Sequence, residues 1–130
     1  MAKRIREKTA KIAETKEKRP HASAKYIRIS PFKVRPVLDT VRGKSVNEAL
    51  ATLSVMPKAA SEVVYKLISS ATANAENNLG LARADLFVAE IYADGGPILK
   101  RVQPVSKGRA YRINKRTSHI TVILDVKEVK

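Results

Sequence analysis

The sequence predicts an α+β fold, in which a small three-stranded antiparallel sheet packs on about three helices and carries a long, protruding basic β-hairpin. Segments with strand character occur at 24–29, 86–94 and 118–126, and segments with helical periodicity lie between the first two of them. The 23 residues from Gly95 to Thr117 separate the last two strands; they are too many for a tight turn and are strongly basic. A length of 130 residues suits one domain of this kind.

The first 20 residues are expected to form a basic, extended N-terminal tail. They contain no aromatic residue, and Ile5 and Ile12 are their large aliphatic residues, so they bury too little surface to offset the entropy lost on ordering. Lys, Glu and Ala are frequent enough for a helix to form on a partner, although an isolated helix of this length is marginal in water. Residues 21–130 are expected to form a single globular α+β domain, with the hairpin arm inserted at about 95–118.

The first strand segment, 24–29, alternates weakly and leads into a helix. Ser30 and Pro31 form a helix-start signal, with serine at the N-cap and proline at the first helical position. Gly43 supplies a C-terminal stop. An apolar stripe at positions i, i+3, i+4 and i+7 is expected to pack on the body. It consists of Val34, Val37, Leu38 and Val41.

Basic residues border this apolar stripe. Arg35 and Arg42 fall on one flank and Lys33 on the other, since successive helical residues are rotated by about 100°. Asp39 lies one turn from Arg35. An ordinary solvated face with an Arg35–Asp39 ion pair is therefore the alternative to a cationic binding surface.

Two further helices are expected in the middle of the chain. Ser45 to Glu48 has the form of a capping box, and apolar residues follow at helical spacing through Leu53. After Pro57 a longer periodic segment runs to Gly80 and forms a central helix. Its apolar face is expected to serve packing rather than chemistry, and it comprises Ala60, Val63, Val64, Leu67, Ile68, Ala71 and Ala75.

The two strongest strand signals flank the basic arm. Each is rich in β-branched and aromatic residues, and each is expected to present one apolar face. The two faces consist of Phe87, Ala89, Ile91 and Ala93 in the first strand and of Ile120, Val122, Leu124 and Val126 in the second. The arm between them keeps some alternation, so a long ribbon that extends both strands away from the body is the expected geometry.

Charge makes nucleic acid the first hypothesis for the partner. Lys and Arg total 26 against 12 Asp and Glu, which gives a net charge of +14 and favours polyphosphate partners. The segment 48–94 is mildly acidic, so a nearly neutral body carries two basic extensions. If six or seven arm cations each neutralise a phosphate, the logarithmic salt slope of binding is roughly −4 to −6. These cations are Lys100, Arg101, Lys107, Arg109, Arg112, Lys115 and Arg116, and the arm contains no acidic residue.

A disordered basic loop without a specific target is the alternative interpretation of the arm. Pro97 and Pro104, the glycines at its base and tip, and the apolar residues between the charges favour a defined shape instead. Tyr26 and Tyr111 are candidates for stacking on unpaired bases, and ordinary packing is an equal alternative for both.

Catalytic chemistry finds little support. His21 and His119 are the only histidines and are read as structural or phosphate-facing groups, while the carboxylates are too scattered to predict a metal site. Lys107-Gly108 lacks the spacing of a P-loop. The chain has no cysteine, no apolar run of about 20 residues and no stretch resembling a signal peptide. We therefore expect a cytoplasmic protein that is not an enzyme and uses no metal, cofactor, small-molecule substrate or membrane.

A dense, ordered series of short motifs fills the arm. It reads Gly96-Pro97-Ile98-Leu99-Lys100-Arg101, then Pro104, Lys107-Gly108-Arg109-Ala110, Arg112-Ile113 and Lys115-Arg116-Thr117-Ser118-His119-Ile120-Thr121-Val122. Further motifs are Lys33-Val34-Arg35, Val41-Arg42-Gly43-Lys44, Ser70-Ala71, Ala73-Asn74-Ala75-Glu76 and Asn78. Over about residues 22–126 this pattern resembles the ribosomal protein L twenty-two family of the bacterial large subunit.

The resemblance implies a structural constituent of the large ribosomal subunit that binds 23S rRNA and supports early subunit assembly. It places the body near the peptide exit and the hairpin along the exit tunnel, close to ribosomal protein L four, with the tip facing the nascent peptide. The tip residues would be Ser106, Lys107, Gly108 and Arg109. The rRNA-binding residues would be Lys25, Arg28, Lys33, Arg35, Arg42, Lys44, Lys100, Arg101, Arg112, Lys115, Arg116 and His119.

The chain departs from the family pattern in three places. Val105-Ser106 replaces a pair that is commonly arginine-alanine, Tyr111 often has an aspartate counterpart, and the first twenty residues look longer than in compact members. We expect the tail to make additional rRNA contacts. Two other functions stay open: a free-standing architectural DNA- or RNA-binding protein that uses the same arm and, with less support, a basic nuclease, for which no acid/base pair is visible.

Overall fold

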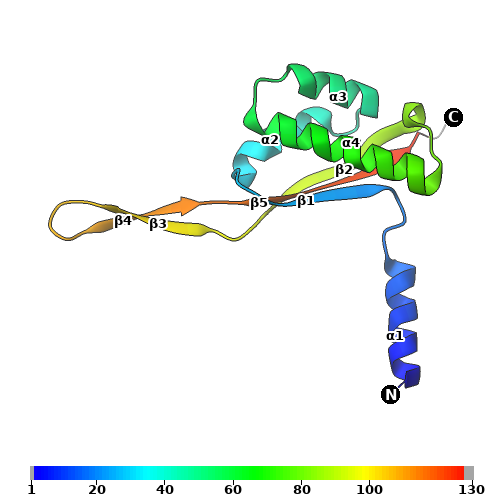
Figure 1. Ribbon diagram of the computed structural model, residues 1–130, viewed down its shortest axis with the longest axis horizontal. Coiled ribbons are helices and arrows are strands. Elements are labelled where there is room, and N and C mark those ends of the chain that lie inside the picture. Colours follow the sequence, from blue (N-terminus) through cyan, green and yellow to red (C-terminus); the bar gives the residue numbers. More distant parts are fainter. Residues whose placement is uncertain (1, 128–130) are drawn as a thin grey trace.

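The computed structural model describes residues 2–127; residues 1 and 128–130 lie outside the described part of the chain. Within residues 2–127 the chain forms four α-helices, a three-stranded antiparallel sheet and a separate two-stranded ribbon (Figure 1). This confirms the predicted α+β fold with a protruding hairpin. The elements are α1 (Ala2–Thr15), β1 (His21–Ile27), α2 (Pro31–Val41), α3 (Val46–Val55), α4 (Ala59–Leu79), the 3₁₀ helix η1 (Arg83–Asp85), β2 (Leu86–Gly95), β3 (Leu99–Pro104), β4 (Ala110–Lys115) and β5 (Ser118–Val126).

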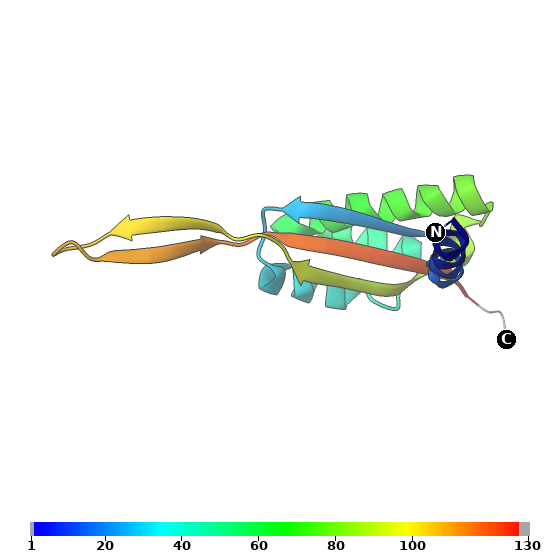
Figure 2. The same cartoon turned by 90° about the horizontal axis from the view of Figure 1, so that it is seen from below.

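The hydrophobic core lies between one face of the β1–β5–β2 sheet and the helices α2, α3 and α4 (Figures 1 and 2). Leu38 of α2, Ile68 of α4, and Ile120 and Leu124 of the central strand β5 are fully buried there. Burial of one such side chain contributes about 1.5–3 kcal/mol. Packing against the helices therefore fixes β5, the strand into which the hairpin returns.

The helix boundaries follow the sequence signals. Ser30 is the N-cap of α2 and proline occupies its first turn, although the Ser30 side chain makes no capping hydrogen bond. The Ser45 hydroxyl accepts a hydrogen bond from the Glu48 backbone N–H at 3.4 Å, which is one of the two hydrogen bonds of the predicted capping box. The central helix α4 ends at Gly80. Among these helices the side-chain cap is therefore present at the start of α3, whereas α2 begins at its proline without one.

The face of β2 that packs on the helices differs from the predicted one. Phe87 and Ala89 were expected to face the core, but both are only half-buried. The pairing with β5 shifts by one residue between Val88 and Glu90. A β-bulge at this point moves the following side chains to the opposite face, so alternation counted across it loses its phase. The prediction for Phe87 and Ala89 is therefore wrong, and the buried residues are Leu86, Val88, Ile91 and Ala93.

Strand β1 also contains a bulge. The strand itself begins at His21, three residues before the predicted segment. Its register with β5 shifts between Ala24 and Ile27. Tyr26, inside the bulge, has a φ of 57°, in the left-handed region. This conformation costs a residue other than glycine roughly 1–2 kcal/mol. The early start also places His21 in the strand rather than in the tail.

The N-terminal segment is helical, which corrects the expected extended tail over the described part of residues 1–20. None of the side chains of α1, Ala2–Thr15, is buried, and the helix projects from the end of the body opposite the hairpin (Figure 1). Its frequent Ala, Lys, Arg and Glu residues have high helix propensity, so local hydrogen bonding rather than burial accounts for it. Neither α1 nor any other helix within residues 2–127 is long and apolar enough to cross a membrane.

Candidate nucleic-acid interface

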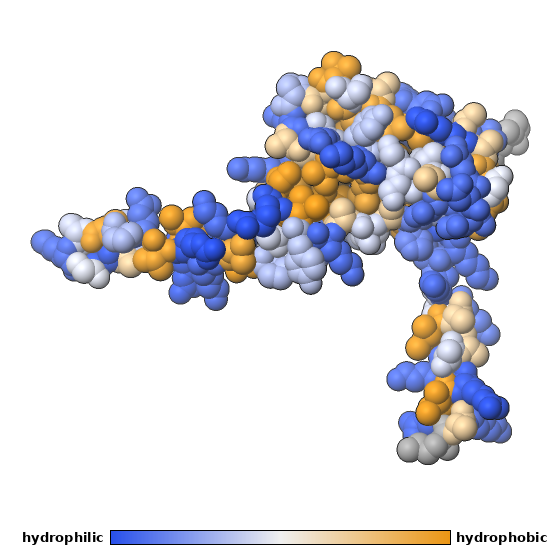
Figure 3. All heavy atoms as spheres, in the orientation of Figure 1, coloured by the Kyte–Doolittle hydropathy of each residue, from blue (hydrophilic) through white to orange (hydrophobic). Residues whose placement is uncertain are grey.

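The hairpin arm is a regular antiparallel ribbon. β3 pairs with β4 from Leu99 opposite Lys115 to Pro104 opposite Ala110, and all side chains of the two strands are exposed or half-buried. Hydrophilic and hydrophobic side chains are interleaved along its length (Figure 3). The arm adds no residue to the buried core, so its side chains are available to a partner.

Cations lie on both faces of the ribbon. Residues opposite each other across an antiparallel pair share a face, and successive residues alternate between faces. Arg101 and Lys115 therefore lie on one face, and Lys100 and Arg112 lie on the other. Each of these four cations stands opposite an uncharged residue, so like charges do not meet directly across the strands. Such an arm suits insertion between nucleic-acid segments better than contact with a single flat surface.

The tip of the arm is a tight turn built on two left-handed residues. Lys107 has a φ of 58° and Gly108 a φ of 68°, the pattern that a two-residue type I′ turn requires. The Arg109 N–H donates to the Ser106 carbonyl at 3.4 Å, and the Val105 N–H donates to the Arg109 carbonyl at 3.0 Å. The turn leaves the side chains of Lys107 and Arg109 exposed at the end of the arm.

The base of the arm is a close backbone contact that only glycine permits. The Gly96 N–H donates to the Thr117 carbonyl at 2.9 Å, and the Thr117 hydroxyl donates to the Pro97 carbonyl at 2.7 Å. A Cβ atom on Gly96 would lie 2.4 Å from the Thr117 hydroxyl oxygen. Thr117 is itself buried, so it has little room to give way. The predicted base glycine is thus explained by a specific neighbour.

A groove of about 550 Å³ beside this base brings together cations that are far apart in the sequence. Arg28 follows β1 and Lys33 belongs to α2. Lys115 is the last residue of β4, and Arg116 follows it. The remaining lining residues, Ile29, Ser30, Ala59 and Asn114, add no charge. Four exposed cations around one concave surface can bind successive phosphates of a nucleic-acid backbone.

Arg35 of α2 and Arg42, which follows the helix as its C-cap, are partly engaged within the body. Arg42 donates to Asp39 at 2.6 Å and to the Ile91 carbonyl at 2.9 Å. The Arg35–Asp39 pair suggested by the spacing is therefore replaced by Arg42–Asp39. Arg35 donates weakly to the Ala93 carbonyl at 3.4 Å and lies 5.2 Å from the centre of the Phe32 ring. Both arginines thus tie α2 to β2, a structural role that the helical spacing does not indicate.

Three further predicted contact residues have distinct surroundings. Lys25 is exposed in the β1 bulge, and Lys44 lies 3.8 Å from Glu48 in a surface ion pair. His119 Nδ1 accepts a hydrogen bond from the Tyr26 backbone N–H at 3.0 Å. His119 therefore supports the β1 bulge, whatever it contacts outside the chain.

The histidines and carboxylates of residues 2–127 do not gather into a metal-binding cluster. No group of three or more His, Cys, Asp or Glu side chains within residues 2–127 is placed to hold a metal ion. His21 and His119 lie near opposite ends of the β1–β5 pair, and His21 Nδ1 is 3.0 Å from the Arg19 carbonyl oxygen. The two histidines therefore do not form an acid/base pair.

A model of the family described as ribosomal protein L22p/L17e matches residues 22–125, which include the body, the groove and the whole arm. The chain belongs to the ribosomal protein L22p/L17e family. The large ribosomal subunit protein uL22 of Clostridium kluyveri is 59% identical over 107 residues, covering 82% of this chain and 96% of that protein. The uL22 of Clostridium tetani is 58% identical over the same length. These matches confirm the resemblance noted in the sequence.

Membership of the L22p/L17e family settles the broad role of the chain. Proteins of this family are structural constituents of the large ribosomal subunit and not enzymes. The chain is accordingly a large-subunit protein. Composition alone left open a free-standing architectural protein and a nuclease. Family membership favours the large-subunit protein over both.

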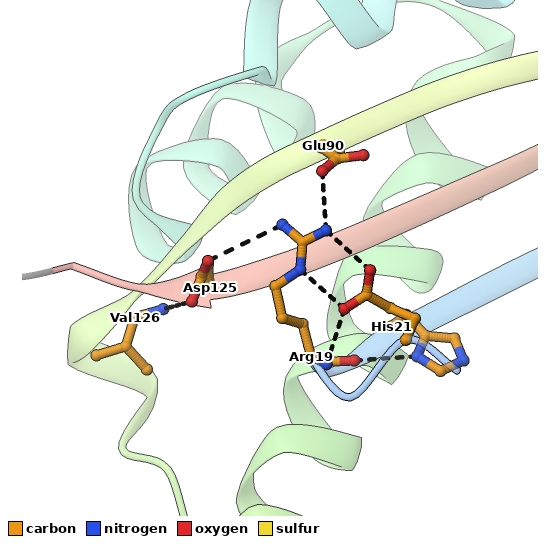
Figure 4. Close-up of polar contacts among 6 residues, drawn as sticks. Arg19, His21, Glu90, Asp125 and Val126 are labelled. Atoms are coloured by element: carbon orange, nitrogen blue, oxygen red, sulfur yellow. Dashed lines mark hydrogen bonds and ion pairs between the residues drawn. The ribbon is translucent and has the colours of Figure 1, made fainter. Parts of the chain in front are cut away.

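The link between α1 and the body lies outside the region matched by the L22p/L17e model and is held by Arg19 (Figure 4). The Arg19 guanidinium bonds both carboxylate oxygens of Glu17 at 2.9 Å and reaches Glu90 at 2.9 Å and Asp125 at 4.0 Å. The hydrogen bond from the Arg19 side chain is the main cause that lowers the pKa of Glu17 from 4.5 to about 2. In addition, the Leu124 N–H donates to the Pro20 carbonyl at 2.9 Å.

The sequence did not single out Arg19. Its partners Glu90 and Asp125 are distant in the chain, and only Glu17, two residues away, offers a local signal. This cluster, here called the Arg19 clamp, fixes the point at which the N-terminal segment leaves the L22p/L17e body. It therefore gives α1 a defined origin rather than a freely moving one.

Proposed function

We propose that this chain binds large-subunit rRNA through the hairpin arm and the groove at its base. The observation that carries the proposal is the placement of exposed cations on both faces of a ribbon that buries none of its side chains. Exposed cations on such a ribbon do little to stabilise the folded chain. They contribute binding free energy when they contact the phosphates of a nucleic acid. The groove cations Arg28, Lys33, Lys115 and Arg116 extend the same surface onto the body.

The tip of the arm is proposed to line the peptide exit tunnel, close to ribosomal protein L four. The turn of Lys107 and Gly108 is narrow and lies at the far end of the arm from the body. Val105 and Ser106 carry no charge, so the cations at the tip are Lys107 and Arg109. These would face the tunnel wall and the nascent peptide while the body remains near the tunnel exit.

Support for early subunit assembly is part of the same proposal. The body has its own buried core, whereas the arm has none. The folded body can therefore bind rRNA first. The arm then takes its final place as the RNA folds around the arm. Binding of this kind joins RNA segments that are otherwise separate.

Paired charge variants test rRNA binding. Arg112→Gln with Lys115→Gln removes two cations from the interface, and Lys66→Gln with Arg83→Gln removes two cations that already contact Glu62 and Asn47 within the body. Binding to a 23S rRNA transcript is measured over a range of salt concentrations. The arm variant should lower the salt slope by roughly 1.4–1.8, because each phosphate contact contributes about 0.7–0.9. Equal slopes for the two variants would reject the interface.

The helix α1 is proposed to make additional rRNA contacts near the body. It carries Lys and Arg on a surface that is exposed along its whole length, and it starts from the point fixed by the Arg19 clamp. Deletion of residues 1–18 should leave the body folded, since no α1 side chain is buried and none belongs to the core, and should reduce chemical protection of the rRNA. Unchanged protection and unchanged subunit assembly would rule out this contact.

A further inference from the structure

Tyr26 has an unusual backbone conformation that its side chain does not require for packing. Its φ of 57° falls where a β-bulge normally uses glycine. The residue is 66% exposed, so the ring contributes little to the core. A strained residue whose ring adds little to the core points to a role outside the fold.

His119 holds Tyr26 in this conformation. Its Nδ1 accepts the Tyr26 backbone N–H at 3.0 Å, and the two rings meet edge to face, with centroids 4.9 Å apart and planes at 86°. The imidazole lies beside Gly96, where an added Cβ atom would be 3.2 Å from its Cε1 and Nε2 atoms. The residue that positions Tyr26 is therefore next to the base of the arm.

The surroundings of Tyr26 favour nucleic acid as the occupant of its exposed ring. Lys25 and Arg28 are its neighbours in the chain and both are exposed. Arg28 lines the groove that also contains Lys33, Lys115 and Arg116. An exposed aromatic ring beside a run of cations is the arrangement by which proteins stack a base while holding the flanking phosphates.

Another exposed tyrosine in the same sheet lacks these features. Tyr92 of β2 is 42% exposed, but the residues on either side at i−2 and i+2 are Glu90 and Asp94. Carboxylates beside a ring repel the phosphates that accompany a base. Tyr92 therefore serves as a control, because it is an exposed tyrosine of the same sheet with acidic rather than basic neighbours.

We propose that Tyr26 is a stacking platform for an unpaired base of the bound RNA, and that His119 is the residue that positions it. The inference rests on the proposed rRNA binding and adds to it a site that recognises a base rather than phosphates. The structure thus divides the interface into two parts: a cationic arm and groove, and a single aromatic contact at the bulge of β1.

The absence of tryptophan from the sequence provides a direct test. Tyr26→Trp and Tyr92→Trp each introduce a single tryptophan into the full-length chain. Both proteins are titrated with a 23S rRNA transcript while tryptophan emission is recorded. Binding is followed separately by filter retention. Emission from the Tyr26→Trp protein should be quenched on binding, and emission from the Tyr92→Trp protein should change little. Tyr26→Ala should weaken binding by roughly 5- to 150-fold, and Tyr26→Phe should retain it, because stacking needs only the ring.

Two further variants separate the ring from the fold. Tyr26→Gly suits the left-handed backbone, so it should unfold at the same or a higher urea concentration while binding as weakly as Tyr26→Ala. In the Tyr26→Trp background, His119→Asn keeps an acceptor for the residue 26 N–H and should preserve quenching, whereas His119→Leu removes the acceptor and should reduce it.

The outcomes distinguish this inference from the function on which it rests. RNA binding that is retained without quenching of the Tyr26→Trp protein, or that is retained by Tyr26→Ala, overturns the stacking site and leaves the rRNA-binding proposal intact. Equal quenching in the Tyr26→Trp and Tyr92→Trp proteins also overturns it. Failure of the wild-type chain to bind the transcript overturns both proposals together.

Discussion

Gly96 controls how the hairpin leaves the body. Gly96→Ala would place a Cβ atom 2.4 Å from the Thr117 hydroxyl oxygen, and Thr117 is 4% exposed and bonded to the Pro97 carbonyl. We expect this substitution to lower the free energy of unfolding by about 1–3 kcal/mol, the usual cost of overpacking a filled site. Urea denaturation measures the change.

Gly95→Ala is the matched control for this prediction. A Cβ on Gly95 meets no atom within 4 Å, and Gly95 does not have a positive φ. The neighbouring substitution should therefore change the free energy of unfolding by less than about 0.5 kcal/mol. Similar losses for the two alanine variants would show that the base is not as tightly packed as the contact distance indicates.

Glu17 is the residue through which pH acts on the Arg19 clamp. Its pKa falls from 4.5 to about 2 in the folded chain, chiefly because of the hydrogen bond from the Arg19 side chain. A lowered carboxyl pKa stabilises the folded state fully above the ordinary value and ceases to do so as pH falls through the lower one. The contribution of Glu17 should therefore be present above about pH 4.5 and disappear towards pH 2.

An NMR titration of the Glu17 side-chain carbonyl checks this prediction. The wild-type midpoint should lie near 2, and Arg19→Gln should return it towards 4.5. A Glu17 midpoint that Arg19→Gln does not move would contradict the clamp.

Among the elements, α2, α3 and α4 were predictable because each has a local start signal and an uninterrupted apolar period. The positions of β2 and β1 were predicted, but the side chains that face the core were not all predicted correctly. The bulges near Ala89 and Tyr26 depend on pairing with β5 and leave no clear mark in the sequence. The segment that forms α1 was expected to be an extended tail, because it buries too little apolar surface to offset the entropy that the chain loses on ordering. The segment is helical although none of its side chains is buried, in keeping with its high helix propensity.

The arm is the element whose independence from the core can be tested directly. Replacing residues 98–116 with a short turn should leave the body folded, because β3 and β4 pair with each other and contribute nothing to the buried core. The urea midpoint of the shortened chain should match that of the full chain. Loss of cooperative unfolding would show that the arm is part of the body rather than an insertion in it.

In the molecule as a whole, two basic extensions leave a body that has its own core. The arm continues from one end of the sheet and α1 projects from the other (Figures 1 and 3). The order of motifs in the arm was enough to predict the family, and charge is the basis for proposing a nucleic-acid partner. The groove at the base of the arm could not be predicted, because Arg28, Lys33 and Lys115 converge only after the sheet and α2 have packed.

Chemical footprinting of 23S rRNA tests the central claim, that the arm and groove bind rRNA. The full chain, and the chain in which a short turn replaces residues 98–116, are compared on the same transcript after both are shown to be folded. Because the cations of the arm lie on both faces of its ribbon, the full chain should protect rRNA segments that the shortened chain leaves reactive, while protections due to the body persist in both. Identical footprints for the two chains would contradict the claim that the arm binds rRNA.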